Sequence, residues 1–223
     1  MKALFYTEFG TPDVLTIGHL PDPILRPADV LLAVSATALN RLDIVQRNGW
    51  FTLPGFSLPH VAGMDLAGTV VEVGSGVNHV KTGDRVVADP SLHAVSGDSQ
   101  FTGLGERYGD LGVIGATHAG GYGELCAVSA DHVHPIPDAM DFATAAVFPT
   151  AWMTTHHALF RVGELRSGET LLVHGATSAL TLAATQMAVA AGARVLVTAA
   201  SEEKCAIAQG LGAAATTTNR ESD

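Results

Sequence analysis

Short hydrophobic runs recur through the first 125 residues of the chain, and turn residues separate them. The runs that predict strands are Lys2–Tyr6, Val30–Ala38, Ala67–Val73 and Arg85–Ala88. Glycine and proline clusters lie between them. Short apolar runs interrupted in this way are typical of a small β-barrel or sandwich. The first part of the chain is therefore expected to be rich in β-structure.

Helical spacing begins beyond Pro137. Asp141 is placed to cap a helix that extends to about Leu159. Buried strands then alternate with helices, a pattern that predicts a parallel, doubly wound sheet. The expected elements are strands at Glu169–His174 and Arg194–Ala199 and helices at Leu182–Ala191 and Glu202–Leu211, with Gly192 ending the first helix.

These patterns predict two domains, residues 1–137 and residues 138–223. A doubly wound nucleotide fold is built from two βαβαβ halves. Residues 138–223 are expected to hold two strands and two helices of the first half, and the run Gly212–Thr218 leads toward another strand. The second half is expected to be missing from this sequence.

Composition limits which kinds of partner the protein can bind and which cellular compartment suits it. The 223 residues include 12 Lys plus Arg and 22 Asp plus Glu, a net charge of −10 that disfavours a nucleic-acid partner. Two cysteines, Cys126 and Cys205, suit a reducing cytoplasm better than a disulfide scaffold. The N-terminus does not resemble a signal peptide, and no apolar run is long enough to span a membrane. A soluble cytoplasmic protein is expected.

Three segments, in this order, resemble the medium-chain dehydrogenase/reductase superfamily: Ala67–Ala88, Gly109–Val128 and Glu169–Ala200. The first resembles the core of the superfamily's catalytic barrel and the last the start of its nucleotide domain. The resemblance implies an N-terminal GroES-like β-barrel domain followed by an incomplete Rossmann domain that binds NADP. It also implies that the chain is truncated at its C-terminus.

Zinc-dependent members of the superfamily carry a metal ligand at each of three positions, and here those positions hold Asn40, Met64 and Thr150. Catalytic zinc requires three ligands drawn from His, Cys and carboxylate side chains. The loop Asp89–Arg107, where relatives bind a structural zinc, contains no cysteine. The resemblance is therefore to the zinc-free quinone oxidoreductases, and no metal site is expected.

The ten histidines offer an alternative metal site. His132 and His134 would share one face of a strand, and His156 and His157 are adjacent. Neither pair has a cysteine or carboxylate cluster beside it in the sequence. These side chains are expected to be ordinary packed or exposed histidines.

A polar pair and an aromatic pair are the candidate substrate site. Asn40 and Asp43 resemble the polar residues that line the pocket of quinone reductases and are the candidate catalytic residues. Trp50 and Phe51 follow an Arg-x-Gly segment and could form an apolar lid over a flat substrate.

A structural role for the polar pair remains open. Asn40 could be the N-cap of a helix, since asparagine is among the best capping residues. Asp43 could pair with Arg41 or Arg47.

The nucleotide site is expected at a turn that departs from the superfamily's glycine pattern. Relatives place glycines here so that the backbone approaches the pyrophosphate and the helix packs close to the strand. Ser178, Ala179 and Thr181 replace glycines in this chain. The residues expected at the phosphates are Gly175, Ala176, Thr177, Ser178, Ala179 and Leu180.

Residues after the second buried strand favour NADPH over NADH. Enzymes that use NAD place a carboxylate at the tip of that strand, where it bonds the ribose hydroxyl. Here Ser201 and Lys204 resemble the phosphate-holding residues of relatives that use NADPH, although Lys204 could be an ordinary exposed lysine. Thr154 matches the superfamily's threonine near the nicotinamide, and it could instead bond its own helix.

The leading hypothesis is an NADPH-dependent oxidoreductase that transfers hydride to a quinone, enone or related carbonyl without zinc. Whether a truncated chain is active is left open by the sequence. One alternative is a relative of the zinc-type alcohol dehydrogenases. The other is a degenerate, non-catalytic relative that acts as a binding or assembly partner. The expected partners are a small-molecule carbonyl or quinone substrate and, as in many relatives, a second copy of the chain.

Overall fold

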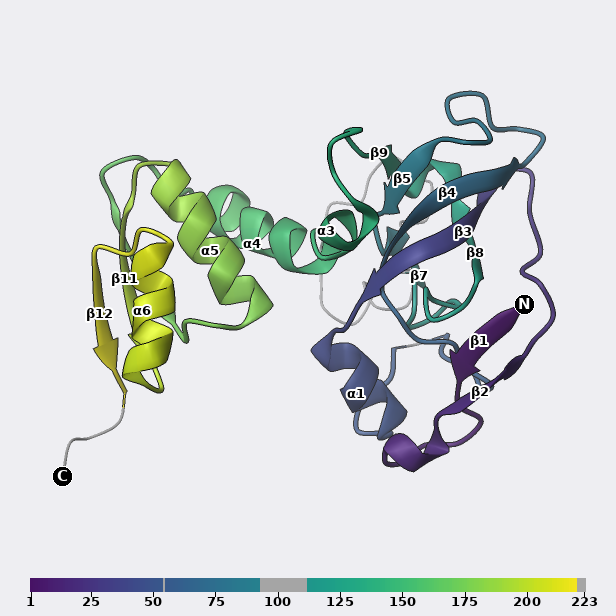
Figure 1. The fold of residues 1–223 in the computed structure, drawn as a ribbon, viewed down its shortest axis with the longest axis horizontal. Helices are drawn as coiled ribbons and strands as arrows, with labels where there is room; N and C mark the ends of the chain where they lie inside the picture. The colour runs from purple at the N-terminus through teal and green to yellow at the C-terminus, as the bar shows by residue number, and fades with distance from the viewer. Residues whose placement is uncertain (54, 93–111, 220–223) are drawn as a thin grey trace. The chain divides into compact units, whose positions relative to one another are not determined.

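The computed structural model describes residues 1–53, 55–92 and 112–219 (Figure 1). The chain divides into two compact units, Met1–Thr150 and Ala151–Asp223. No helix within the described ranges is long and apolar enough to cross a membrane.

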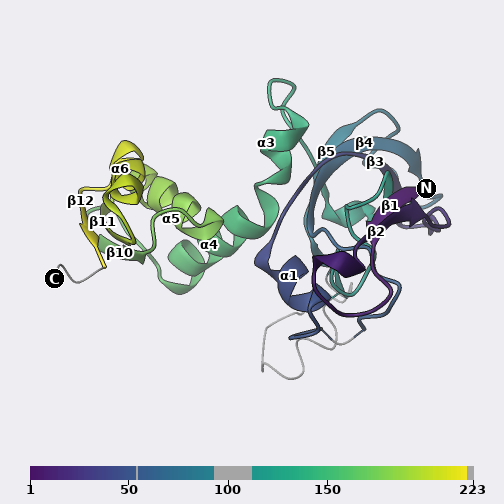
Figure 2. The ribbon, with the colours of Figure 1, turned by 60° about the horizontal axis from the view of Figure 1, so that its bottom comes forward.

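The first unit is built around an antiparallel five-stranded sheet with the order β8-β3-β4-β5-β9. Its strands curve around the core in Figure 2. The β-rich character expected from the sequence is therefore present. The sheet strands are β3 (Asp29–Ala38), β4 (Asp65–Val73), β5 (Arg85–Ala88), β8 (Leu125–Ser129) and β9 (Val133–Pro135); the two smaller pairs are β1 (Lys2–Phe5) with β2 (Thr16–His19) and β6 (Ser91–Leu92) with β7 (Gly112–Val113).

Alternation of side chains along these strands forms the core of the first unit. Val30 and Leu32 of β3 are fully buried, as are Val70 of β4 and Val86 of β5. Residues two apart on a strand point to the same face of the sheet, so these side chains meet in one cluster. The position of β3 between β4 and β8 then fixes where its carboxyl end lies, and the candidate site begins at that end.

The division between the units falls after Thr150, whereas the sequence pattern placed it after residue 137. Helix α3 (Phe142–Ala146) explains the difference. Asp141 caps it as expected, because its side chain accepts a hydrogen bond from the Thr144 N–H at 2.6 Å. Ala145 and Ala146 are buried against Ala67 of β4, so this helix belongs to the first unit.

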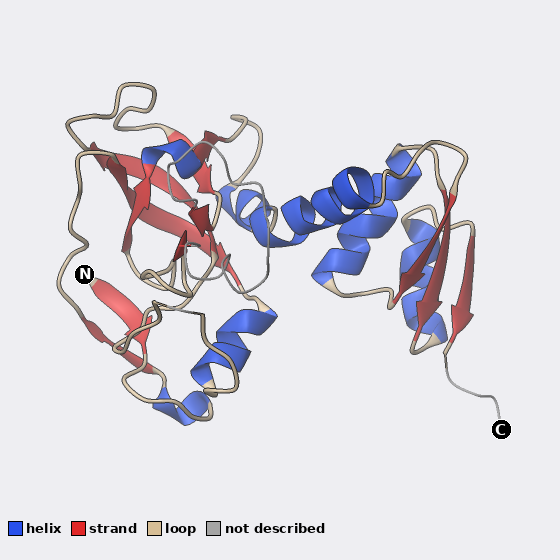
Figure 3. Cartoon of the chain, turned by 180° about the vertical axis from the view of Figure 1, so that it is seen from behind, coloured by secondary structure: helices blue, strands red, loops and turns tan. Residues whose placement is uncertain are grey.

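The second unit is a parallel sheet with the order β10-β11-β12. Its strands are β10 (Thr170–His174), β11 (Arg194–Ala199) and β12 (Ala215–Thr218). Helices α5 (Ala179–Ala190) and α6 (Glu202–Gly210) pack on one face of this sheet, on the same side of its strands in Figure 3. The buried residues between them include Val195, Val197, Ala188 and Ala208.

The run Gly212–Thr218, expected to lead toward another strand, contains β12, which pairs Val197 with Thr216 in parallel. One sequence expectation needs correction. The helix expected to extend to about Leu159 is instead composite. It contains α4 (Thr154–His156) between the π-helical turns Pro149–Met153 and His157–Val162.

Candidate functional site

The polar pair lies where β3 gives way to helix α1 (Arg41–Arg47). Asn40 is the N-cap of α1, and its backbone N–H donates to Asp43 Oδ2 at 2.7 Å. The capping role that the sequence left open is therefore present. Asn40 and Asp43 form a capping box at this helix end, and the Asn40 side-chain amide also donates from Nδ2 to Asp65 Oδ2 at 2.9 Å.

Asp43 is buried and bonded to three neutral donors. Besides the Asn40 N–H, it accepts from the Tyr122 hydroxyl at 2.7 Å and from the Gly63 N–H at 3.2 Å. These contacts replace the pairing with Arg41 or Arg47 that the sequence left open. Burial, followed by the hydrogen bond to Asp43, raises the pKa of the Tyr122 hydroxyl well above its usual value. Tyr122 therefore keeps its proton and serves as a donor.

Asp65 is the centre of a second set of hydrogen bonds. Only 2% of it is exposed, at the start of β4. Its Oδ1 accepts from the Thr150 N–H at 2.9 Å and from the Thr150 hydroxyl at 2.7 Å, while Oδ2 accepts from Asn40. Burial raises the pKa of the Asp65 carboxyl; these hydrogen bonds oppose the rise, and the nearby Asp43 carboxylate adds to it.

Two of the three positions at which zinc-dependent relatives carry a metal ligand therefore hold residues that are hydrogen-bonded to Asp65. Asn40 and Thr150 meet at Asp65, and Met64 is the neighbour of Asp65 in the chain. Among the described residues, no group of three or more His, Cys, Asp or Glu side chains could hold a metal ion. Most of the loop 89–107, where relatives bind structural zinc, lies outside the described residues.

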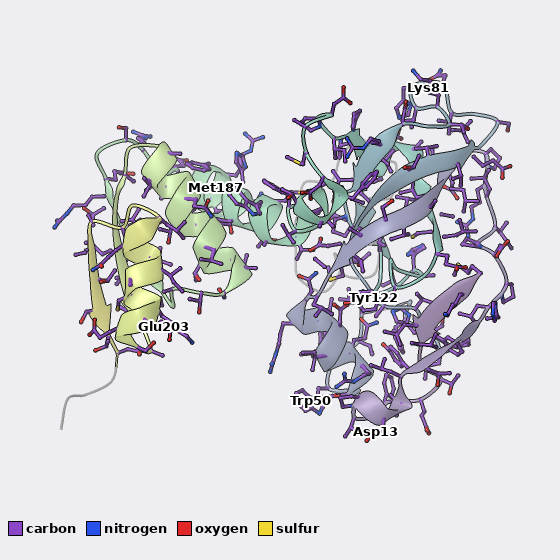
Figure 4. The ribbon with its side chains drawn as sticks, in the orientation of Figure 1. Asp13, Trp50, Lys81, Tyr122, Met187 and Glu203 are labelled. Carbon is purple, nitrogen blue, oxygen red and sulfur yellow. The ribbon has the colours of Figure 1, made fainter. Side chains whose placement is uncertain are left out.

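The aromatic pair is not placed with the polar pair. Trp50 and Phe51 follow the C-terminal end of α1, the end opposite Asn40, and are 68% and 48% exposed. Figure 4 shows Trp50 at the foot of α1, away from Tyr122. A cavity of about 460 Å³ borders Tyr122, and neither aromatic residue lines it; its walls include Lys2, Leu4, Val34, Thr37 and Glu124.

The turn after β10 combines an open glycine with a capped helix. Gly175 has φ +86°, and a Cβ added there would meet nothing within 4 Å. Ser178 caps α5: its Oγ accepts from the Thr181 N–H at 3.2 Å, and its own N–H donates to Thr181 Oγ1 at 3.1 Å. The two side chains that replace glycines therefore bond each other and the helix end.

This turn retains features that a pyrophosphate requires. The first N–H groups of a helix have no partner within it, so those of Ala179 and Leu180 remain for an anion. Ala176 is 2% exposed and packs in the core of the second unit, which suits a small residue. Thr177 is half-buried beside it. A dinucleotide fits here, with hydroxyl groups beside the backbone donors.

The turn after β11 lies at the same edge of the sheet. Residues His174 and Thr198 are paired at the carboxyl ends of β10 and β11, which brings the two following turns together. Ser201 is the N-cap of α6, with its Oγ accepting from the Lys204 N–H at 3.4 Å. The Lys204 side chain is exposed.

Thr154, expected near the nicotinamide, is the exposed first residue of α4. Its neighbour Thr155, which sequence reasoning passed over, is buried, and its hydroxyl donates to the Leu180 carbonyl at 3.3 Å. That bond ties α4 to the first turn of α5. The threonine doublet thus contains one buried residue that contacts the first turn of α5 and one exposed residue.

Sequence reasoning also missed Asp65, Tyr122 and Gly63. Asp65 is adjacent to Met64, so the missing imidazole could have drawn attention to the acid beside it. Tyr122 lies 79 positions from Asp43 in sequence, and no local pattern links the two residues.

Comparison with known proteins agrees with this fold. The family model for the alcohol dehydrogenase GroES-like domain matches residues 26–138. The chain therefore belongs to this family, within the medium-chain dehydrogenase/reductase superfamily. The architecture expected from the sequence, a GroES-like domain followed by part of a Rossmann domain, is confirmed.

Similar proteins include oxidoreductases of several kinds. The quinone oxidoreductase of Rattus norvegicus is 34% identical over 205 residues, covering 91% of this chain and 54% of the relative. The chloroplastic NADPH-dependent alkenal/one oxidoreductase of Arabidopsis thaliana is 34% identical, covering 96% of this chain and 51% of the relative. A crystal structure of an NAD-dependent alcohol dehydrogenase has a TM-score of 0.89 and 33% identity, covering 100% of this chain and 65% of that chain. The chain spans about half the length of the curated relatives it matches.

Proposed function

We propose that the protein is an NADPH-dependent oxidoreductase that transfers hydride to a quinone, an enone or a related carbonyl without zinc. One observation carries the proposal. At the positions where zinc-dependent relatives have ligands, Asn40 and Thr150 are hydrogen-bonded to Asp65. The side chains at those positions thus form a neutral-donor network around a buried carboxylate, which favours a reaction that needs no Lewis acid.

An enone or quinone suits such a site because the acceptor itself delocalises the developing negative charge. Bound NADPH would supply a hydride, leaving NADP⁺, and the hydride would bond to the β-carbon of an enone while the carbon–carbon π electrons move toward the carbonyl oxygen. A proton from solvent would then complete the saturated ketone. The protein contributes orientation and hydrogen bonds.

Asn40 is the residue of this cluster best suited to hold the carbonyl oxygen. One Nδ2 hydrogen bonds Asp65, and the other is available to an acceptor. A hydrogen bond to that oxygen strengthens as negative charge builds on it. Asp43 and Tyr122 support this residue from the opposite side through its backbone N–H. The name of the Arabidopsis relative, an alkenal/one oxidoreductase that depends on NADPH, supports the same substrate class and cofactor.

The cofactor is assigned to the second unit. The open turn at Gly175, the N–H groups of Ala179 and Leu180, and the hydroxyl of Ser178 would hold the pyrophosphate. Ser201 and Lys204 would hold the additional phosphate of NADPH. Thr154 would lie near the nicotinamide. The exposure of Gly175, Ser178 and Lys204 at one sheet edge supports this assignment.

Titration of the purified full chain with NADPH, followed by fluorescence, tests the cofactor assignment. We expect saturable binding, with Kd in the micromolar range, ~1 μM to 1 mM. Gly175→Ala should weaken binding about tenfold, because a Cβ would occupy the space through which the backbone approaches phosphate.

Gly168→Ala is the matched control for this titration. Gly168 has φ +85° and open space like Gly175, in the same unit, but it lies away from the nucleotide turn. Both variants therefore carry the same backbone strain, and only Gly175→Ala should affect NADPH. Absence of saturable NADPH binding by the unmodified chain would contradict the enzyme assignment and favour a non-catalytic relative.

A further inference from the structure

The buried carboxylate of Asp65 needs a reason to be retained. Removing a carboxylate from water is costly unless hydrogen bonds compensate it, and among the described residues the Asp65 carboxylate accepts hydrogen bonds only from neutral groups of Asn40 and Thr150. The Asp43 carboxylate lies near enough to add repulsion. An amide in place of Asp65 would avoid both costs. A carboxylate at this position must therefore provide something that an amide would not.

What a carboxylate provides is a fixed orientation of the Asn40 amide. An ionised carboxylate only accepts hydrogen bonds, whereas an amide group can present either its oxygen or its nitrogen. Rotating the Asn40 amide by half a turn would bring its oxygen against Asp65 Oδ2, which is repulsive. Asp65 therefore fixes Nδ2 on its own side and directs the Asn40 carbonyl away from itself.

Asn40 is held at two points by two different acids. Asp43 fixes its backbone N–H at 2.7 Å and Asp65 fixes its side chain at 2.9 Å. Asp65 in turn holds Thr150 through both its hydroxyl and its N–H. The Asp65 carboxylate therefore joins three segments that are distant in sequence. Asp65 begins β4, Asn40 follows the end of β3, and Thr150 lies in the π-helical turn Pro149–Met153.

We infer that Asp65 is a positioning residue that sets the orientation of the Asn40 amide toward the substrate carbonyl. It ties together by hydrogen bonds two positions that a metal ion would link in a zinc-dependent relative. This inference rests on the proposed function for its catalytic consequence, whereas its structural part, a single fixed orientation of the amide, can be measured without any turnover.

The variant that tests the inference is Asp65→Asn. Its side-chain oxygen can keep both bonds from Thr150, and its new NH2 group would then face Asn40. The Asn40 amide must turn to present its oxygen, which displaces the donor meant for the substrate. A misplaced group of this kind costs about a hundredfold in rate. We expect kcat with methyl vinyl ketone to fall by about ten- to a hundredfold, and NADPH affinity to stay within about twofold.

The second readout is the NMR signal of the Asn40 side-chain NH2 group. In the unmodified chain the two NH2 protons should exchange slowly with solvent. In Asp65→Asn their chemical shifts should change. Asp138→Asn is the matched control, because it removes the same charge from an exposed side chain. It should change neither the NH2 signal nor kcat.

A double variant, Asn40→Asp with Asp65→Asn, separates positioning from structural support. It keeps one carboxylate and one amide in the same hydrogen bond but removes the amide donor from position 40. The double variant should regain the free energy of unfolding that Asp65→Asn loses, but its kcat should stay low. Recovery of kcat in this double variant would overturn the inference, as would an Asp65→Asn variant with unaltered kcat and an unaltered Asn40 NH2 signal. If the unmodified chain reduces neither enones nor quinones but the NH2 signal responds to Asp65→Asn, the positioning part stands and the proposed function fails.

Discussion

Replacing Gly115 with alanine is expected to lower the free energy of unfolding by about 3 to 5 kcal/mol. Gly115 has φ +72°, and an added Cβ would lie 2.5 Å from the Gly63 carbonyl carbon and 2.7 Å from the Met64 nitrogen. Those neighbours are backbone atoms, so no side-chain rotation can relieve the overlap. The displaced segment includes the Gly63 N–H that donates to Asp43.

Gly83→Ala is the control for this prediction. Gly83 has φ +95° with nothing within 4 Å of the added Cβ, so it reports the cost of the backbone conformation alone, about 1 kcal/mol. Urea unfolding followed by circular dichroism should place the Gly115→Ala midpoint well below that of Gly83→Ala. Equal midpoints for the two variants would mean that the backbone is not packed as closely around Gly115 as the structure indicates.

The second large effect concerns the choice between NADPH and NADH. Lys204→Ala should weaken NADPH binding by about ten- to a hundredfold and leave NADH binding within about twofold, because a charge-assisted bond to phosphate is worth ~1.5–3 kcal/mol. Glu202 and Glu203 lie in the first turn of α6, where Figure 4 labels Glu203, and their charges oppose a phosphate nearby, which makes the Lys204 charge more important.

Two further variants make this prediction specific. Ser201→Ala should add to the loss of NADPH affinity, and it also removes the cap of α6 at a cost of ~1 kcal/mol, so its stability is measured alongside. Lys81→Ala removes the same charge from an exposed side chain of the first unit and should alter neither affinity. Equal weakening of NADPH and NADH by Lys204→Ala would refute the assignment of the phosphate site.

Local sequence signals predicted the last helix of the first unit and most elements of the second unit. Asp141 marked the start of α3, and apolar runs marked β10 and β11. Gly192, with φ +79°, follows α5 as expected of a residue that ends a helix. Each of these signals acts within a few residues, through capping, periodicity or backbone conformation, and therefore can be read directly from the sequence.

The candidate site depended on contacts that local signals do not encode. Asn40 and Asp43 are three residues apart, and their relation as N-cap and first-turn acid was foreseeable. Asp65 and Thr150 are separated from each other by 85 positions and meet only because β3 pairs with β4 and α3 packs on the sheet. Trp50 shows the opposite case: resemblance of its Arg-x-Gly segment to a family motif suggested a lid over the substrate, but Trp50 follows the end of α1 opposite Asn40.

The rate of NADPH oxidation by metal-free protein tests the central claim most directly. The purified full chain would be treated with a chelator, its zinc content measured, and NADPH consumption followed with methyl vinyl ketone and with para-benzoquinone. We predict that turnover persists at the untreated rate with zinc far below one ion per chain. Loss of turnover on chelation, with recovery when zinc is returned, would contradict the account.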